Sequence, residues 1–210
     1  MRNVLSATLV SLCAGAASAG IVTHTVPFTL GVPGSTTVFV PAFNDSLGTL
    51  TRVTLTINTA IRARVTAENH STQNNQFTTS IGGTVSADGP GDLDAAAIMS
   101  FTSLPINVGP SDGVALIGPD FADFGIVSAT GAAAQQLNGG FEAFTGQAMP
   151  VAVSTLGQFR VSGQGNSTIR VGAFAADGDV IITYEFNPIP TPGAAALLGV
   201  GGLLALRRRR

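Results

Sequence analysis

Two histidines and one cysteine are the most chemically versatile side chains of this 210-residue chain. A serine nucleophile needs a histidine as its base, and zinc needs three or four histidine, cysteine or carboxylate ligands. His24 lies near the start of the chain, His70 lies in the polar run 68–75, and neither has a nucleophile motif beside it. Cys13 lies in an N-terminal apolar segment. We therefore predict a protein that is not an enzyme, with no catalytic residue, no cofactor and no metal-binding residue.

Carboxylates gather at three places in the chain. The groups are Asp88, Asp92 and Asp94 around a Gly-Pro-Gly turn, Asp120 and Asp123 beside Phe121, and Asp177 and Asp179 beside Gly178. Calcium accepts oxygen ligands from such loops, but the spacing is not that of an EF-hand, and turns recruit Asp for their own backbone bonds. Paired carboxylates also serve glycosidases, although Trp is absent and Tyr184 is the only Tyr. A glycan- or calcium-binding surface module, and less favourably a secreted hydrolase, remain as alternatives.

The charge distribution excludes one class of partner. Charged residues make up only 10% of the chain, all ten basic residues are Arg, and five of these lie in the two terminal segments. The middle keeps five Arg against all twelve acidic residues, a net charge of −7. Because an acidic domain without a basic patch is repelled by phosphates, we expect no nucleic-acid partner.

Residues 1–19 have the three parts of a secretory signal peptide. Arg2 supplies the positive region, an apolar stretch covers residues 4–17, and Ala17-Ser18-Ala19 supplies small residues for a peptidase pocket. We predict cleavage before Gly20 by signal peptidase, and therefore export.

Residues 188–210 have the composition of a membrane anchor. Pro188, Pro190 and Pro192 interrupt regular structure, an apolar run covers residues 193–206, and the chain ends in four arginines. The positive-inside rule keeps those arginines in the cytoplasm. A helix over the apolar run would be roughly 21 Å long, short of the roughly 30 Å hydrocarbon core. We predict a C-terminal transmembrane anchor helix that holds the protein only transiently.

The same tail resembles a PEP-CTERM sorting segment, the substrate signal of exosortases. The resemblance rests on the motif Pro190, Thr191, Pro192 and Gly193, on the apolar segment, and on Arg207, Arg208, Arg209 and Arg210. Thr191 stands where the name-giving motif has Glu. The resemblance implies cleavage by an exosortase-like membrane protease and delivery to the cell surface or extracellular matrix of a bacterium, where extracellular polysaccharide is a candidate partner.

The middle of the chain, residues 20–187, has the patterning of one all-β domain. Apolar residues alternate with polar ones along 50–68, and we interpret 58–60 as the turn of a β-hairpin. The dipeptide Asp177-Gly178 predicts a second short hairpin. Further strands are expected at 22–30, 36–40, 76–86, 97–104, 114–117, 140–144, 151–161, 167–174 and 179–186, whereas 128–137 is left open between a short helix and a loop. Many short strands with Gly and Pro between them favour an antiparallel β-sandwich.

Two stretches of this domain resemble the choice-of-anchor E family. The first is 43–55, with Leu47-Gly48-Thr49-Leu50 and Val53-x-Leu55, followed by Glu68-Asn69, and the second is 180–188, with Tyr184. The resemblance implies an extracellular β-rich domain without attributed catalytic residues. We therefore expect an exported surface or extracellular-matrix protein of structural or interaction type.

Overall fold

The computed structural model describes residues 19–163 and 165–189. This part of the chain forms nine strands and two short 3₁₀ helices. The strands are β1 (Gly20–Gly31), β2 (Gly34–Val40), β3 (Gly48–Asn69), β4 (Asn75–Asp88), β5 (Asp94–Thr102), β6 (Ile106–Val108), β7 (Phe121–Leu137), β8 (Met149–Ser162) and β9 (Ser167–Pro188). The 3₁₀ helices are η1 (Asp45–Leu47) and η2 (Phe141–Phe144).

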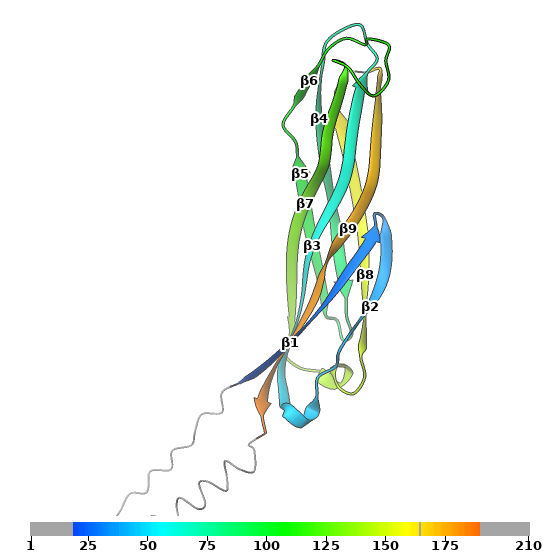
Figure 1. The fold of residues 1–210 in the computed structure, drawn as a ribbon. Helices are drawn as coiled ribbons and strands as arrows, with labels where there is room; N and C mark the ends of the chain where they lie inside the picture. The colour runs from blue at the N-terminus through cyan, green and yellow to red at the C-terminus, as the bar shows by residue number, and fades with distance from the viewer. Residues whose placement is uncertain (1–18, 164, 190–210) are drawn as a thin grey trace, which may run out of the picture.

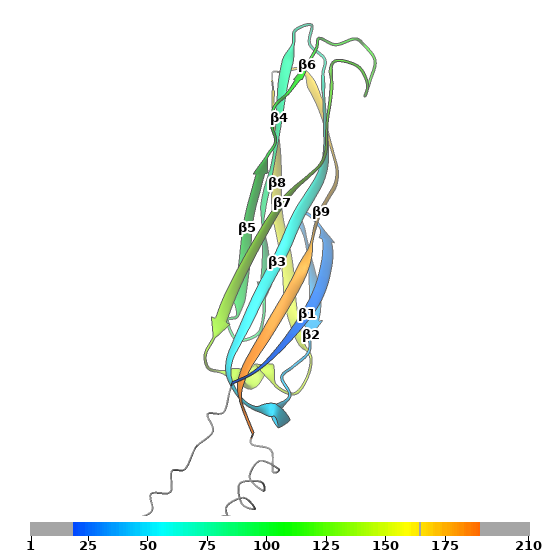
Figure 2. The ribbon, with the colours of Figure 1, turned by 60° about the vertical axis from the view of Figure 1, so that its left-hand side comes forward.

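The strands form two antiparallel sheets that pack face to face. The first sheet has the order β1-β9-β3-β7 and the second β2-β8-β4-β5, with β6 paired to β4. Figures 1 and 2 show the two layers as a long, narrow sandwich. The prediction of an all-β antiparallel sandwich is confirmed. Among the described residues, no helix is both long enough and apolar enough to cross a bilayer. The predicted anchor helix, the sorting motif at 190–193, the arginines at 207–210 and Ala17 lie outside those residues, whereas Ala19 and Gly20 lie within them.

Two strands are far longer than the sequence pattern indicated. β3 and β9 each run for 22 residues. Thr59 and Gly178, in the middle of the two predicted turns, face each other as register partners in the centre of this strand pair. Both hairpin predictions were therefore wrong. Thr59 donates its hydroxyl to the Asp177 carbonyl (3.0 Å), which satisfies a polar group inside the strand.

Three further assignments need correction. Residues 128–137, which were left between helix and loop, belong to strand β7. The predicted strand at 114–117 is irregular loop, and the one at 140–144 is mostly the 3₁₀ helix η2. The other predicted strands coincide with observed ones, the two at 167–174 and 179–186 being halves of β9.

The core lies between the sheets and follows the alternation along each strand. The odd-numbered residues of β3 point inward from Val53 onward and the even-numbered residues of β9 from Phe174 onward, and Leu55, Ile57 and Ile182 are almost completely buried. A smaller cluster of Ala67, Phe77, Val108 and Ala122 continues the core toward one end. Burial of this apolar surface is the main stabilising term of such a sandwich.

Both ends of the described chain leave the sandwich at the same end, which we call the base. Gly20 pairs with Phe186, and Gly48 pairs with Pro188, so the start of β1 and the end of β9 lie together. The opposite end, which we call the tip, is formed by the loop 70–74, by the segment 103–120, which includes β6, and by residues 163 and 165–166 (Figures 1 and 2). The site described next lies at the tip.

Candidate functional site

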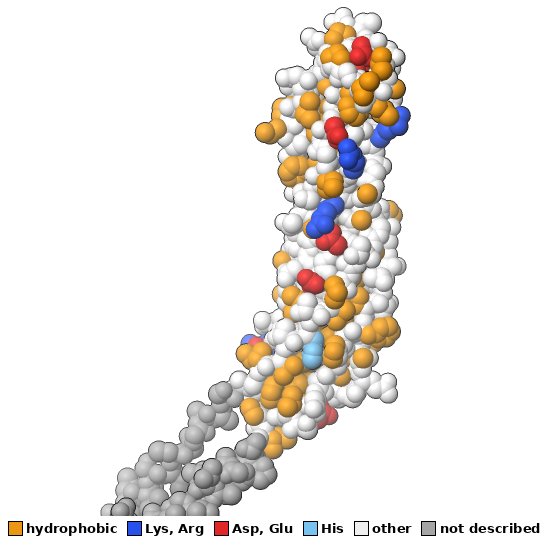
Figure 3. Space-filling view, viewed as in Figure 1, with side chains coloured by type: hydrophobic (Ala, Val, Ile, Leu, Met, Phe, Trp, Pro, Cys, Tyr) orange, Lys and Arg blue, Asp and Glu red, His pale blue; other side chains and the backbone are white. Residues whose placement is uncertain are grey.

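The tip is built by main-chain hydrogen bonds between its loops. The His70 N–H donates to the Asn166 carbonyl (2.9 Å), and the Ser111 N–H donates to the Ser71 carbonyl (2.8 Å). Hydrophobic side chains gather on the outside of this end (Figure 3), and the exposed large ones are Leu104, Val114, Leu116 and Ile117. Three loops from distant parts of the chain therefore form one structural unit.

Asn69, the last residue of β3, is the central polar residue of the tip. It is 0% exposed and its side chain makes four hydrogen bonds. Its Nδ2 donates to the carbonyls of Gln73 and Gly109, both at 2.8 Å. Its Oδ1 accepts from the N–H and the hydroxyl of Ser71. Because one amide satisfies partners in two loops, it fixes these loops relative to the end of β3.

Two carboxylates are also buried at the tip. Glu68 is 4% exposed, although its position in β3 places it on the outer face of the sheet. The loop after β6 covers it, and the N–H of Leu116 donates to its Oε1 (3.1 Å). The alternation of apolar and polar residues along 50–68 predicts Glu68 on the solvent-exposed face of the strand, and this prediction is wrong because a loop distant in sequence lies over it.

Asp120 is the second buried carboxylate, with an exposure of 0%. Its Oδ2 accepts the N–H of Asp112 (3.2 Å), and its main-chain carbonyl accepts the N–H of Asn69 (2.9 Å). Its Oδ1 is buried and has no hydrogen-bond partner, the only described side-chain atom in that condition. Buried polar atoms are nearly always paired, so this oxygen needs an explanation.

The exposed carboxylate of Asp112 lies beside Asp120. Its Oδ1 accepts the N–H of Val114 (2.8 Å) within the loop. Its Oδ2 would overlap a Cβ placed on Gly118, and Asp120 Oδ1 lies 3.2 Å from the same position. The free oxygens of Asp112 and Asp120 thus converge on the space beside Gly118, which only a glycine leaves open.

The other carboxylates named from the sequence do not join this group. Asp123 forms an ion pair with Arg64 (2.7 Å) and Asp177 with Arg62 (3.0 Å), both on the outer face of the first sheet. Figure 3 shows acidic and basic side chains along this face. Asp88, Asp92 and Asp94 lie around the β4–β5 loop at the base. Across residues 19–163 and 165–189, no three or more His, Cys, Asp or Glu side chains come together as metal ligands.

The two histidines lie in different parts of the sandwich. His24 is in β1, opposite Ile182, and its ring makes a T-shaped contact with the ring of Tyr184 at 6.0 Å between centroids. His70 is exposed at the tip, as expected, with its Nε2 2.8 Å from the hydroxyl of Thr168. The structure therefore does not bring them together.

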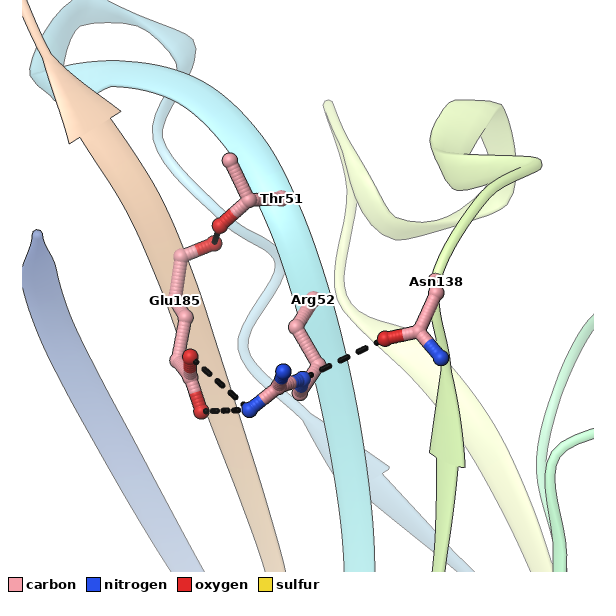
Figure 4. A network of polar contacts seen from close by, with 4 residues as sticks. All are labelled: Thr51, Arg52, Asn138 and Glu185. Atoms are coloured by element: carbon pink, nitrogen blue, oxygen red, sulfur yellow. Dashed lines mark hydrogen bonds and ion pairs between the residues drawn. The ribbon is translucent and has the colours of Figure 1, made fainter.

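A second polar network joins three elements near the base (Figure 4). One terminal nitrogen of Arg52 lies 3.1 and 3.2 Å from the two carboxylate oxygens of Glu185, and the Arg52 Nε donates to Asn138 (3.2 Å). The hydroxyl of Thr51 donates to the Glu185 carbonyl (3.0 Å). Because these side chains come from β3, β9 and the β7–η2 loop, the network ties the exit of β9 to its neighbours.

The comparisons with known proteins give no family for this chain. No family model and no curated protein matches it. Two solved structures of infectious bursal disease virus, of the Gt and Gx strains, align with 100% of the chain at 14% identity and a TM-score of 0.13. The chain covers 54% of each viral chain. A TM-score of this size carries no argument about this protein.

Proposed function

We propose that the chain is an exported surface or extracellular-matrix protein of structural or interaction type, with a choice-of-anchor E-like head domain. Its partners in maturation are signal peptidase, which removes residues 1–19, and an exosortase-like membrane protease, which acts on the tail at residues 190–193. Association with the membrane is transient, and extracellular polysaccharide is the candidate partner after release.

The observation that supports this proposal is the shared position of the two chain ends. Gly20 and Phe186 are register partners at the base, and the last described residue, Ile189, donates its N–H to the Leu47 carbonyl nearby (3.2 Å). Both proposed processing signals adjoin this one end of the sandwich. Cleavage at either of them removes no residue of the sheets, and a tether at the base directs the tip away from the membrane.

Mass spectrometry of the protein recovered from the cell surface tests the proposal. We expect a mature chain that begins at Gly20 and lacks the four terminal arginines. A matched pair of variants gives the control: Pro190→Ala changes the sorting motif, whereas Pro150→Ala changes an exposed proline in β8. Only the first should accumulate with its tail uncut. A surface form that retains residues 207–210 contradicts the sorting proposal.

A further inference from the structure

The unpaired oxygen of Asp120 is the feature of the described chain that most requires a partner. The residue is 0% exposed, and its Oδ1 accepts no hydrogen bond. A carboxylate that is removed from water loses its hydration, and that loss is costly unless a charge or a set of donors replaces it. The single N–H that Asp112 donates to Oδ2 leaves the charge of Asp120 largely uncompensated.

A second carboxylate makes this arrangement less favourable still. The free Oδ2 of Asp112 faces the same space beside Gly118 as Asp120 Oδ1. Two carboxylate oxygens that converge on one point repel each other when both are ionised. Because Gly118 has no side chain, both oxygens can approach its backbone from the same side, where a cation between them would contact both.

We propose that Asp112 and Asp120 bind a calcium ion at the tip. Both free ligands are hard carboxylate oxygens, which suit Ca²⁺ rather than zinc or copper, and Ca²⁺ accepts loop carbonyls and water as its remaining ligands. Asp112 is exposed, so the ion reaches the site from solvent, whereas Asp120 supplies the buried ligand. With only two carboxylates the affinity should be low, with a Kd of about 0.1–1 mM, as in weak extracellular calcium modules.

This inference does not depend on the proposed route of export, because it rests on the tip alone. Bound Ca²⁺ would neutralise the carboxylates of the loop that carries Val114, Leu116 and Ile117, and so hold their side chains in one arrangement. It would thereby fix the outward surface of the tip.

Calorimetric titration of the purified full-length chain with CaCl₂ tests the site, together with thermal unfolding in 10 mM CaCl₂. We expect saturable binding of one ion per chain and a rise in Tm of about 3–10 °C. Asp120→Asn and Asp112→Asn should each abolish both effects. Asp88→Asn, which removes an exposed carboxylate at the base, is the matched control and should leave both unchanged.

If Asp120→Asn does not fold, Asp112→Asn decides, because its amide oxygen still accepts the Val114 N–H. Absence of saturable binding to the unmodified chain overturns the proposal, as does an equal loss of binding in Asp88→Asn. A third result also overturns it: no response to Ca²⁺, combined with a Tm that rises in Asp120→Asn at neutral pH. That result would mean that Asp120 is an uncompensated buried carboxylate that no ion neutralises.

Discussion

Replacing Asn69 with alanine removes the four side-chain hydrogen bonds that hold the tip together. A buried neutral hydrogen bond contributes about 1 kcal/mol, and a partner left without water costs more. Ser71, Gln73 and Gly109 are partly exposed, so some of their groups will rebind water. We therefore expect the free energy of unfolding to fall by about 2–3 kcal/mol, which lowers the Tm by about 5–10 °C in a domain of this size.

Thermal unfolding followed by circular dichroism measures this loss, and amide hydrogen exchange locates it. Exchange should accelerate in the loops 70–74 and 103–120 before it changes in the centre of β3. Asn74→Ala, an exposed residue of the same loop, is the control and should stay within about 0.5 kcal/mol of the unmodified protein. Asn69→Asp should lower the free energy of unfolding at least as much as Asn69→Ala, because a carboxylate oxygen would then face the carbonyl oxygens of Gln73 and Gly109. If Asn69→Ala and Asn74→Ala unfold at the same temperature, the reasoning is refuted.

Two further substitutions test the long strands and the core. Gly178→Ala forces a Cβ against the Asn58 carbonyl, so we expect a loss of about 1–3 kcal/mol in urea unfolding. Gly172→Ala in the same strand places its Cβ in open space and should leave the free energy of unfolding nearly unchanged. Equal urea midpoints for Gly178→Ala and Gly172→Ala would contradict the close packing of β9 against β3. Tyr184→Phe removes the hydrogen bond to the Pro41 carbonyl (2.9 Å) and should cost about 1 kcal/mol at neutral pH. Burial raises the pKa of the Tyr184 phenol above its ordinary value of 10.0, so the unfolded chain ionises first and stability falls above that pH. The Phe variant lacks this ionisable group, so its free energy of unfolding should fall less at alkaline pH. If the free energies of both proteins fall equally from neutral to alkaline pH, the reasoning about Tyr184 is refuted.

The hairpin error shows what alternation can and cannot reveal. The odd-numbered residues of β3 point inward on both sides of Thr59, and the even-numbered residues of β9 do so on both sides of Gly178. The parity thus continues through both predicted turns, although a bulge between Gly172 and Ala175 shifts it in β9, and this continuity indicates a single strand at each turn. The sequence instead predicts two hairpins because Asn58-Thr59-Ala60 and Asp177-Gly178 resemble turns. The structure needs a glycine at position 178 not for a turn but because the backbone of β3 lies too close for a side chain.

The strand β7 was missed because its composition is ambiguous. It includes Gly131 followed by three alanines and two glutamines, residues that favour a helix or a loop when taken locally. Its long pairing with β3 decides its conformation, and local propensity does not contain that contact. The overall sandwich was predictable because most strands of the second sheet keep clear boundaries, whereas the three-residue strand β6 was not predicted.

The tip site was only partly visible in the sequence. Glu68 and Asn69 were named through a family resemblance, and Asp120 was named as one of several loop carboxylates. Their burial depends on a loop that begins about forty residues after Asn69, and the Gly109 carbonyl is one of its contacts. The available signal was Gly118-Pro119-Asp120, where a glycine and a proline shape the loop that carries the acid.

The position of β9 determines how the sandwich responds to mechanical load. It runs antiparallel between β1 and β3, and it leaves at the base through Ile189. Ladder hydrogen bonds lie perpendicular to the strands. If the tip is held and the chain beyond Ile189 is pulled, the force acts along β9 and loads many of these bonds together in shear. The bonds would then resist as a group rather than open one after another, which makes this arrangement of the chain ends suited to a head that stays folded under tension.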